Sequence, residues 1–154
     1  REVFRRNGRP NEGDKLLRDI RVMVQNRPWA YQDAPSLVVF GRTALLAGAD
    51  PKDILDKVYA TAKKVDADQR DVYLAGGDLA LGKHDYALAA KHFEEGLRKL
   101  PEDPDLHFGR ARAYATGDRE VMVESLEASL KQNPRHVPSL LLLADNQIDG
   151  EDYD

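Results

Sequence analysis

Residues 93–118 read FEEGLRKLPEDPDLHFGRARAYATGD, and residues 126–152 read LEASLKQNPRHVPSLLLLADNQIDGED. The two stretches can be superimposed at an almost constant offset, which is 134 − 101 = 33 residues at their prolines. The matched pairs are Phe93 with Leu126, Leu97 with Leu130, and Pro101 with Pro134. Internal periods of about 20 to 50 residues are typical of proteins built from stacked repeats. The repeat therefore predicts a helical solenoid, which offers a surface for partners and no built-in chemistry.

Composition narrows the class of protein. The chain of 154 residues is 42% hydrophobic and 32% charged, as expected of a soluble globular or repeat protein. No apolar run approaches the roughly 18–20 residues needed to cross a bilayer, so we expect no membrane insertion. The net charge of −4 argues against a nucleic-acid partner, because phosphates are neutralised by clustered Lys and Arg. The basic residues among the first nine are interpreted as a solvated tail.

Cysteine is absent from the chain. Disulfides, thiolate metal sites and thiol catalysis are thereby excluded together. The absence does not assign a compartment, so the localisation stays open between the cytoplasm and an exported domain.

Apolar residues at spacings of three and four predict a series of helices. Each predicted helix starts or stops at a Gly, Pro, Asp or Ser that favours a helix end. Ser36 is expected to cap the second helix, and Asp50 followed by Pro51 the third. The predicted helices cover residues 14–26, 36–48, 51–65, 70–81, 86–99, 105–116, 119–132 and 138–148.

These helix pairs resemble the tetratricopeptide repeat (TPR), in which antiparallel helices A and B carry small and aromatic residues at fixed offsets. In residues 70–103 the matching positions are Tyr73, Gly77, Asp85, Tyr86, Ala89, Phe93, Gly96 and Pro101. His84 stands where the family's Gly-Asp-Tyr turn has glycine, and Ala80 where it has tyrosine. Residues 104–136 are one residue short at the turn but keep Ala111, Tyr114, Gly117, Asp118, Leu126 and Pro134. The resemblance implies an all-α, right-handed α-α superhelix.

The same resemblance divides the chain into domains. Residues 1–35 form a lead-in with one helix, and TPR-like units follow at 36–69, 70–103, 104–136 and 137–154. The last unit stops before its helix B, and the chain lacks an initiator methionine. We therefore expect a segment of a larger TPR-containing protein. The unpaired last helix would leave Leu140, Leu142, Leu143 and Ile148 uncovered, which predicts self-association through that end.

Motifs that could carry chemistry are weak. Residues 77–84, GDLALGKH, fit a phosphate-binding loop except that His84 replaces the required Ser or Thr and the preceding residues predict a helix instead of a strand. His84, His92, His107 and His136 form no zinc motif. Adjacent acidic pairs and the serines fit solvent-facing or helix-packing positions, and no Ser, His and acid grouping stands out. We expect no enzymatic activity, no metal and no cofactor.

In the TPR family one face of the A helices lines a concave groove that binds partner segments. Carried over to this sequence, that face alternates apolar residues with charged ones. It consists of Phe40, Leu74, Asp78, Leu81, Phe108, Arg112, Leu141, Asp145 and Ile148. The Lys and Asn of the chaperone-binding carboxylate clamp are missing from the Leu74 and Asp78 sites, so that ligand is not implied.

The resemblance thus predicts a protein-interaction scaffold with a protein or peptide partner on this groove. The best candidates for anchors are Leu74, Phe108, Arg112 and Leu141. The alternative at these sites is that other helices or the N-terminal segment cover them. The alternative function is a non-catalytic accessory domain of a larger enzyme, because the last 22 residues are similar to repeats beside metallopeptidase domains of large bacterial proteins.

Overall fold

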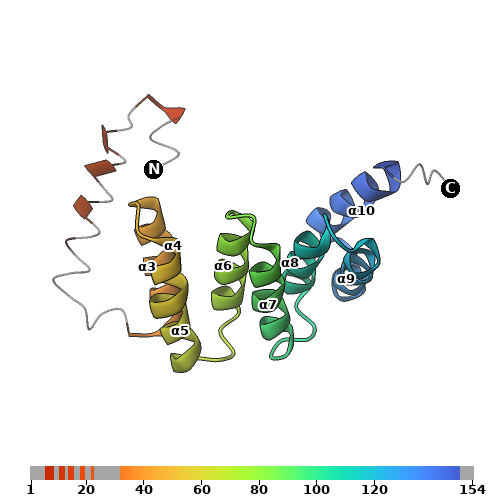
Figure 1. Ribbon diagram of the computed structural model, residues 1–154, viewed down its shortest axis with the longest axis horizontal. Coiled ribbons are helices and arrows are strands. Elements are labelled where there is room, and N and C mark those ends of the chain that lie inside the picture. The colour runs from red at the N-terminus through yellow and green to blue at the C-terminus, as the bar shows by residue number, and fades with distance from the viewer. Residues whose placement is uncertain are drawn as a thin grey trace. The chain divides into compact units, whose positions relative to one another are not determined.

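The computed structural model describes residues 6–8, 11–12, 14–15, 18–19, 22 and 32–149. Across this part of the chain all regular structure is helical (Figure 1), so the predicted all-α solenoid class is confirmed. The chain divides into two compact units, residues 1–72 and 73–154, which are described separately. The predicted lead-in helix at 14–26 lies mostly outside the described residues.

The first unit contains a pair of packed helical segments. α3 (Ala34–Leu46) is followed by α4 (Pro51–Asp53), the π-helix η2 (Ile54–Tyr59) and α5 (Ala60–Val65), and the last three form one continuous rod. α3 packs against η2 and α5. A side chain at Gly41 would overlap the Tyr59 ring, so glycine lets the two helices approach closely.

The π turn in the first unit was not expected from the sequence, which predicts an ordinary helix over 51–65. Ile54 and Tyr59 are five residues apart and are both buried, at 4% and 1% exposure. In an α-helix residues at this spacing point in different directions, whereas the i to i+5 hydrogen bonding of a π turn brings them to one side. The wider turn therefore lets both side chains be buried on one side of the helical segment.

Aspartates begin most of the helices whose N-termini are described. The side chains of Asp33, Asp50, Asp85, Asp103 and Asp118 each accept a hydrogen bond from a backbone N–H in the first turn. Such caps satisfy donors that have no partner within the helix. The predicted cap at Ser36 is wrong by three residues, because Asp33 accepts from the Ser36 backbone N–H at 2.8 Å. The backbone and hydroxyl hydrogen bonds from Ser36 lower the pKa of Asp33.

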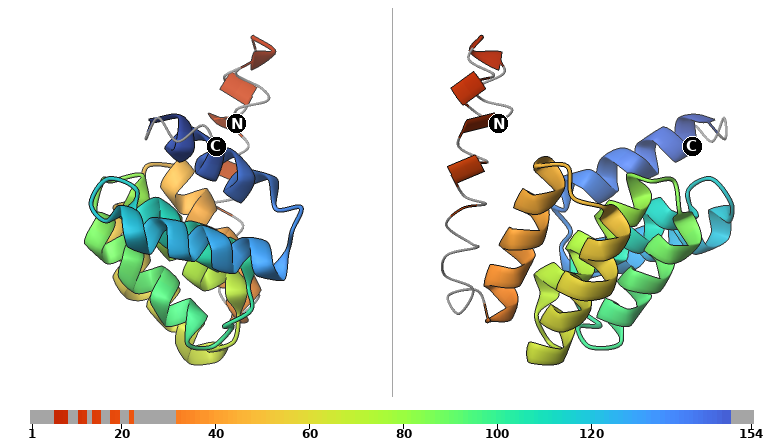
Figure 2. Two further views of the ribbon diagram at one scale, coloured as in Figure 1. Left: turned by 90° about the vertical axis from the view of Figure 1, so that its right-hand side faces the viewer. Right: turned by 60° about the vertical axis from the view of Figure 1, so that its left-hand side comes forward.

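The second unit begins within α6 (Arg70–Leu81) and continues through α7 (Tyr86–Leu97), α8 (Pro104–Tyr114), α9 (Arg119–Gln132) and α10 (Val137–Asp149). The predicted bounds of α6 and α9 are confirmed. α8 begins one residue earlier than predicted because Asp103 caps it, and α7 ends two residues earlier. After a short turn, α10 returns in the direction opposite to α9 (Figure 2).

The ring of Phe93 forms the centre of the main core. It belongs to a buried cluster with Tyr73, Leu106 and several alanines from α6, α7 and α8. A Cβ atom at either Gly77 of α6 or Gly109 of α8 would overlap the Phe93 ring. The ring is therefore held between two helices at points where both lack a side chain.

A second cluster joins α8, α9 and α10. Ala111, Met122 and Leu126 are buried in it, and Leu142 and Leu143 of α10 pack against it. The expectation that Leu142 and Leu143 would be uncovered is therefore wrong. The uncovered apolar residues of α10 are Val137, Leu140, Leu141 and Ile148.

The fit of Phe93 between two glycines predicts that Gly109→Ala destabilises the fold. The added methyl group would displace the ring, which we expect to lower the free energy of unfolding by about 1–3 kcal/mol. This loss occurs although alanine favours helix over glycine by about 1 kcal/mol. Urea denaturation followed by circular dichroism measures the change.

Gly117→Ala is the matched control, because nothing lies within 4 Å of a Cβ atom at that position. We expect its unfolding midpoint to stay close to that of the unchanged protein. Equal stability of both alanine variants would contradict the role assigned to Phe93.

Candidate partner-binding site

The predicted groove residues of α6 and α8 meet at an ion pair. Arg112 Nη1 of α8 lies 2.7 Å from Asp78 Oδ1 of α6, and the two side chains are 41% and 53% exposed. Exposed pairs of this kind contribute about 0–1 kcal/mol to stability. The pair therefore fixes the direction of the guanidinium more than it stabilises the fold.

Phe108 lies between this ion pair and the turn before α10. The Arg112 guanidinium is 5.7 Å from the centre of the Phe108 ring, and the His136 ring packs against it edge to face at 5.5 Å. Phe108 is half-buried and also packs against the second core cluster. Its outer face adjoins a cation, while its inner face stabilises the fold.

The remaining groove positions separate into covered and uncovered residues. Leu74 and Leu81 are half-buried because they pack against the Phe93 cluster. On α10, Leu141 and Ile148 are 61% and 59% exposed, and Asp145 is also exposed. The structure thus places the most accessible apolar sites of the predicted groove on α10.

Phe40 is the one predicted groove residue in the first unit. It is half-buried on α3. Its position relative to the groove residues of the second unit stays a prediction.

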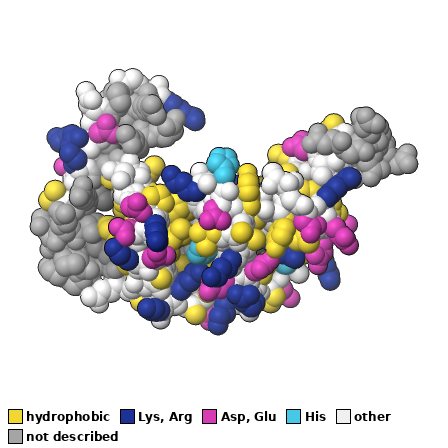
Figure 3. Space-filling model, in the orientation of Figure 1, with side chains coloured by type: hydrophobic (Ala, Val, Ile, Leu, Met, Phe, Trp, Pro, Cys, Tyr) yellow, Lys and Arg dark blue, Asp and Glu magenta, His cyan; other side chains and the backbone are white. Residues whose placement is uncertain are grey.

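On the face drawn in Figure 3, acidic and basic side chains of the described residues are interspersed with hydrophobic ones.

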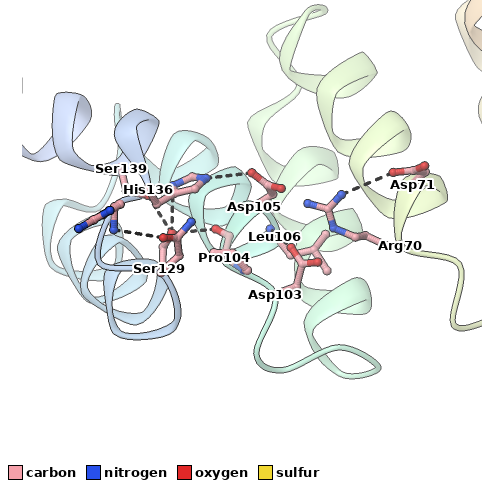
Figure 4. Close-up of polar contacts among 11 residues, drawn as sticks. Arg70, Asp71, Asp103, Pro104, Asp105, Leu106, Ser129, His136 and Ser139 are labelled. Atoms are coloured by element: carbon pink, nitrogen blue, oxygen red, sulfur yellow. Dashed lines mark hydrogen bonds and ion pairs between the residues drawn. The ribbon is translucent and has the colours of Figure 1, made fainter.

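The structure assembles a Ser, His and Asp grouping that the sequence analysis did not find. His136 Nε2 lies 2.9 Å from Asp105 Oδ1, and its Nδ1 lies 2.7 Å from Ser139 Oγ. Figure 4 shows Ser129 and Ser139 turned toward the ring, with Asp105 at its other edge. Ser129 donates to the Pro104 carbonyl at 2.8 Å, and Ser139 donates to Ser129 Oγ at 2.8 Å. The residues come from α8, α9, α10 and the turn before α10.

This network is a structural clasp and has no access to substrate. Ser129 and Ser139 are both 0% exposed, so nothing in solution reaches either hydroxyl. A catalytic histidine takes the proton of a serine that a substrate can reach, and here both hydroxyls are enclosed. The sequence carried no signal for the clasp, since its members lie up to 34 residues apart.

The weaker sequence motifs do not form sites in the structure. Residues 77–84 lie in the second half of α6 and in the turn after it, so the strand required before a phosphate-binding loop is replaced by helix. His84 has a φ of 59°, which explains why glycine is usual at this point of the TPR turn. Among the described residues, no three His, Asp or Glu side chains are arranged to hold a metal ion.

A separate hollow of about 380 Å³ lies between α7 and the end of α8. Ala90 and Ala113 line it together with Tyr86, Tyr114 and Glu94. The Tyr114 hydroxyl donates to Glu94 Oε1 at 3.0 Å, and this hydrogen bond raises the pKa of Tyr114 because the phenolate could not make it. In the sequence Tyr86 and Tyr114 match positions of the repeat, but the sequence predicts no hollow here.

The packed helix pairs define a helical-repeat protein with a TPR-like fold. No protein-family model and no curated protein matches the chain. Two solved structures share its fold, "MamA 41-end from Desulfovibrio magneticus RS-1" and "MamA RS-1 ArsTM double mutant". Each is 18% identical to this chain, with a TM-score of 0.65 over 99% of this chain and 82% of the other. No helix within the described residues is both long and apolar enough to cross a membrane.

Because the clasp is buried, we expect Ser139 to stabilise the fold and to be inaccessible to reagents. Ser139→Ala leaves His136 Nδ1 and Ser129 Oγ each without one hydrogen-bond partner in a buried site. We expect this to lower the free energy of unfolding by about 1–3 kcal/mol. A fluorophosphonate probe should leave Ser139 of the folded protein unlabelled, as read by mass spectrometry.

The control for Ser139→Ala is Thr116→Ala, which truncates an exposed side chain. Its unfolding midpoint should match that of the unchanged protein. Rapid labelling of Ser139 under native conditions would show that the clasp opens and would contradict its purely structural role.

Proposed function

We propose that this chain is a protein-interaction scaffold that binds a partner segment along the inner faces of α6, α8 and α10. The observation that carries the proposal is the arrangement around Arg112. Asp78 and the Phe108 ring hold its guanidinium in one direction, while the side chain remains 41% exposed. Arginine and aromatic residues are enriched among the few contacts that dominate binding energies.

The uncovered residues of α10 extend this site. Leu141 and Ile148 offer apolar side chains to solvent, and Asp145 offers a carboxylate beside them. A partner segment with apolar residues at intervals, and at least one acidic and one basic residue between them, would complement Arg112 and Asp145. The sharing of the TPR-like fold with the two MamA structures supports a scaffold role at the level of the class.

Burial changes which variants can test the groove. Leu74 and Phe108 contribute to the core clusters, so charged substitutions there would weaken the fold as well as the surface. Arg112 and Leu141 are exposed and can be changed without opening a core. Substitutions at Arg112 and Leu141 therefore test partner binding without weakening the fold.

Arg112→Glu and Leu141→Asp should each reduce the amount of partner captured from a lysate of the source organism by at least about tenfold, the factor that corresponds to 1.4 kcal/mol. The charge reversal at 112 places two carboxylates together, and the change at 141 removes an apolar contact. Quantitative mass spectrometry of the captured proteins measures the effect, with circular dichroism confirming that both variants stay helical.

Glu127→Lys is the matched control, since it reverses an exposed charge on α9, outside the predicted groove. It should retain the partner at the level of the unchanged chain. If the two groove variants also retain it, the inner face is not the binding surface.

Self-association through α10 forms a second part of the proposal. The apolar residues left uncovered on that helix support it. The alternative, a non-catalytic accessory domain of a larger enzyme such as a bacterial metallopeptidase, stays a prediction from the sequence.

A further inference from the structure

The side of α10 that faces the rest of the second unit is occupied by contacts with α8 and α9. Ser139 is buried in the clasp, Leu142 and Leu143 pack against the second core cluster, and Asn146 Oδ1 accepts a hydrogen bond from Arg119 Nε at 3.1 Å. These four residues follow one another at spacings of three, one and three, so they occupy one face of the helix.

The opposite face of α10 is a continuous apolar stripe. Its members lie at positions i, i+3, i+4, i+7 and i+11, which share one face of an α-helix. They are Val137, Leu140, Leu141, Ala144 and Ile148. The four large side chains are 59%, 45%, 61% and 59% exposed, and Ala144 is also exposed. We call these five residues the α10 stripe.

We propose that the α10 stripe pairs with the same stripe of a second copy, with the two helices antiparallel about a twofold axis. This inference rests on the self-association included in the proposed function and specifies its geometry. The axis passes between residues 142 and 143, and the pairing forms a closed dimer.

Four of the five stripe positions are self-complementary in that arrangement, and Leu140 lies level with Asp145 of the second copy. Val137 and Ile148 lie equally far from the midpoint between residues 142 and 143. Val137 of one copy would therefore meet Ile148 of the other. Leu141 and Ala144 are likewise equidistant from it, so a large side chain would meet a small one. Large residues facing small ones let two helices pack closely. A parallel pairing would instead place alanine against alanine and leucine against leucine.

Charge also favours the antiparallel arrangement. The sequence of α10, VPSLLLLADNQID, contains no Lys or Arg. Asp145 lies at the edge of the stripe and, in an antiparallel pair, would adjoin the first turn of the second helix. The N-terminal end of a helix carries partial positive charge, which attracts a carboxylate. In a parallel pair both acidic ends would lie together.

The size of the stripe determines how strongly two copies are expected to associate. Stable interfaces usually involve about 20–30 residues on each side, and this stripe contributes five. We therefore expect a weak dimer that forms with rising protein concentration. Because a twofold contact uses the same surface on both copies, it closes and does not propagate into a filament.

Leu141 and Ile148 belong both to the stripe and to the proposed groove. Pairing of two copies would cover these residues. A partner segment that occupies α10 would therefore compete with the second copy, whereas one confined to α6 and α8 would not. Val137, Leu140 and Ala144 belong to the stripe alone.

The absence of cysteine from the sequence allows the geometry to be tested by single cysteine substitutions. Val137→Cys and Ile148→Cys proteins are mixed in a glutathione redox buffer, and the disulfide-linked species are separated. Antiparallel pairing predicts that the mixed disulfide exceeds each homotypic disulfide by about tenfold or more, because only the mixed pair gains a high effective concentration. Ala144→Cys alone should form a homotypic disulfide, since its two copies would lie on either side of the axis. Glu127→Cys, exposed on α9, is the control and should remain unlinked.

Sedimentation equilibrium of the unchanged chain should show a monomer and dimer in equilibrium. The Val137→Asp, Leu140→Asp double variant should remain monomeric at the same concentration and keep its helical circular dichroism spectrum. Four results would overturn the inference: a monomer at every concentration tested, growth beyond a dimer, homotypic disulfides at Val137→Cys, or a dimer that persists in the double variant. Partner capture through Arg112 is unaffected by this double variant, so failure of the dimer can be told from failure of the groove.

Discussion

The ring of Phe93 lies where α6 and α8 come close to α7, and it fits there because Gly77 and Gly109 have no side chains. A helix pair of this size cannot bury its apolar face alone, so it depends on the next pair along the chain. Phe93 provides the contact between the two pairs, because its ring fills the space between its own helix pair and the following one. Once this contact is made, the relative positions of α6 and α8 are fixed. The separation of Asp78 and Arg112 follows from it.

Core packing decides which of the predicted groove residues stay accessible. Leu74 and Phe108 occupy groove positions by their offset in the repeat, but both are half-buried against core clusters. Arg112 lies one turn beyond Phe108, and its charge keeps it at the surface while Asp78 and the ring direct it. The accessible chemistry of the face is therefore concentrated at a guanidinium and at the exposed leucine and isoleucine of α10.

The buried clasp around His136 fixes the position of α10 on the other side of Phe108. It ties the start of α10 to α8 through Asp105 and to α9 through Ser129, and the His136 ring packs on Phe108. The first turn of α10 is thus held by polar contacts, and its middle by Leu142 and Leu143. With that orientation set, Leu140 and Leu141 have no place in the core.

The sequence by itself determined the helical class, the 33-residue offset and the helix ends from α3 to α10 to within about two residues, because these depend on local spacing, on aspartate caps and on glycine and proline at the turns. It also identified Gly77 and Phe93 as packing positions through their resemblance to the repeat. Only the tertiary structure decided which of the four consecutive leucines from Leu140 to Leu143 face the protein, since their composition is uniform and the choice depends on α8 and α9. The π turn, the role of Gly109 and the clasp from Asp105 to Ser139 were also beyond the sequence. Each of these depends on contacts between residues distant in the chain, which helical periodicity does not encode.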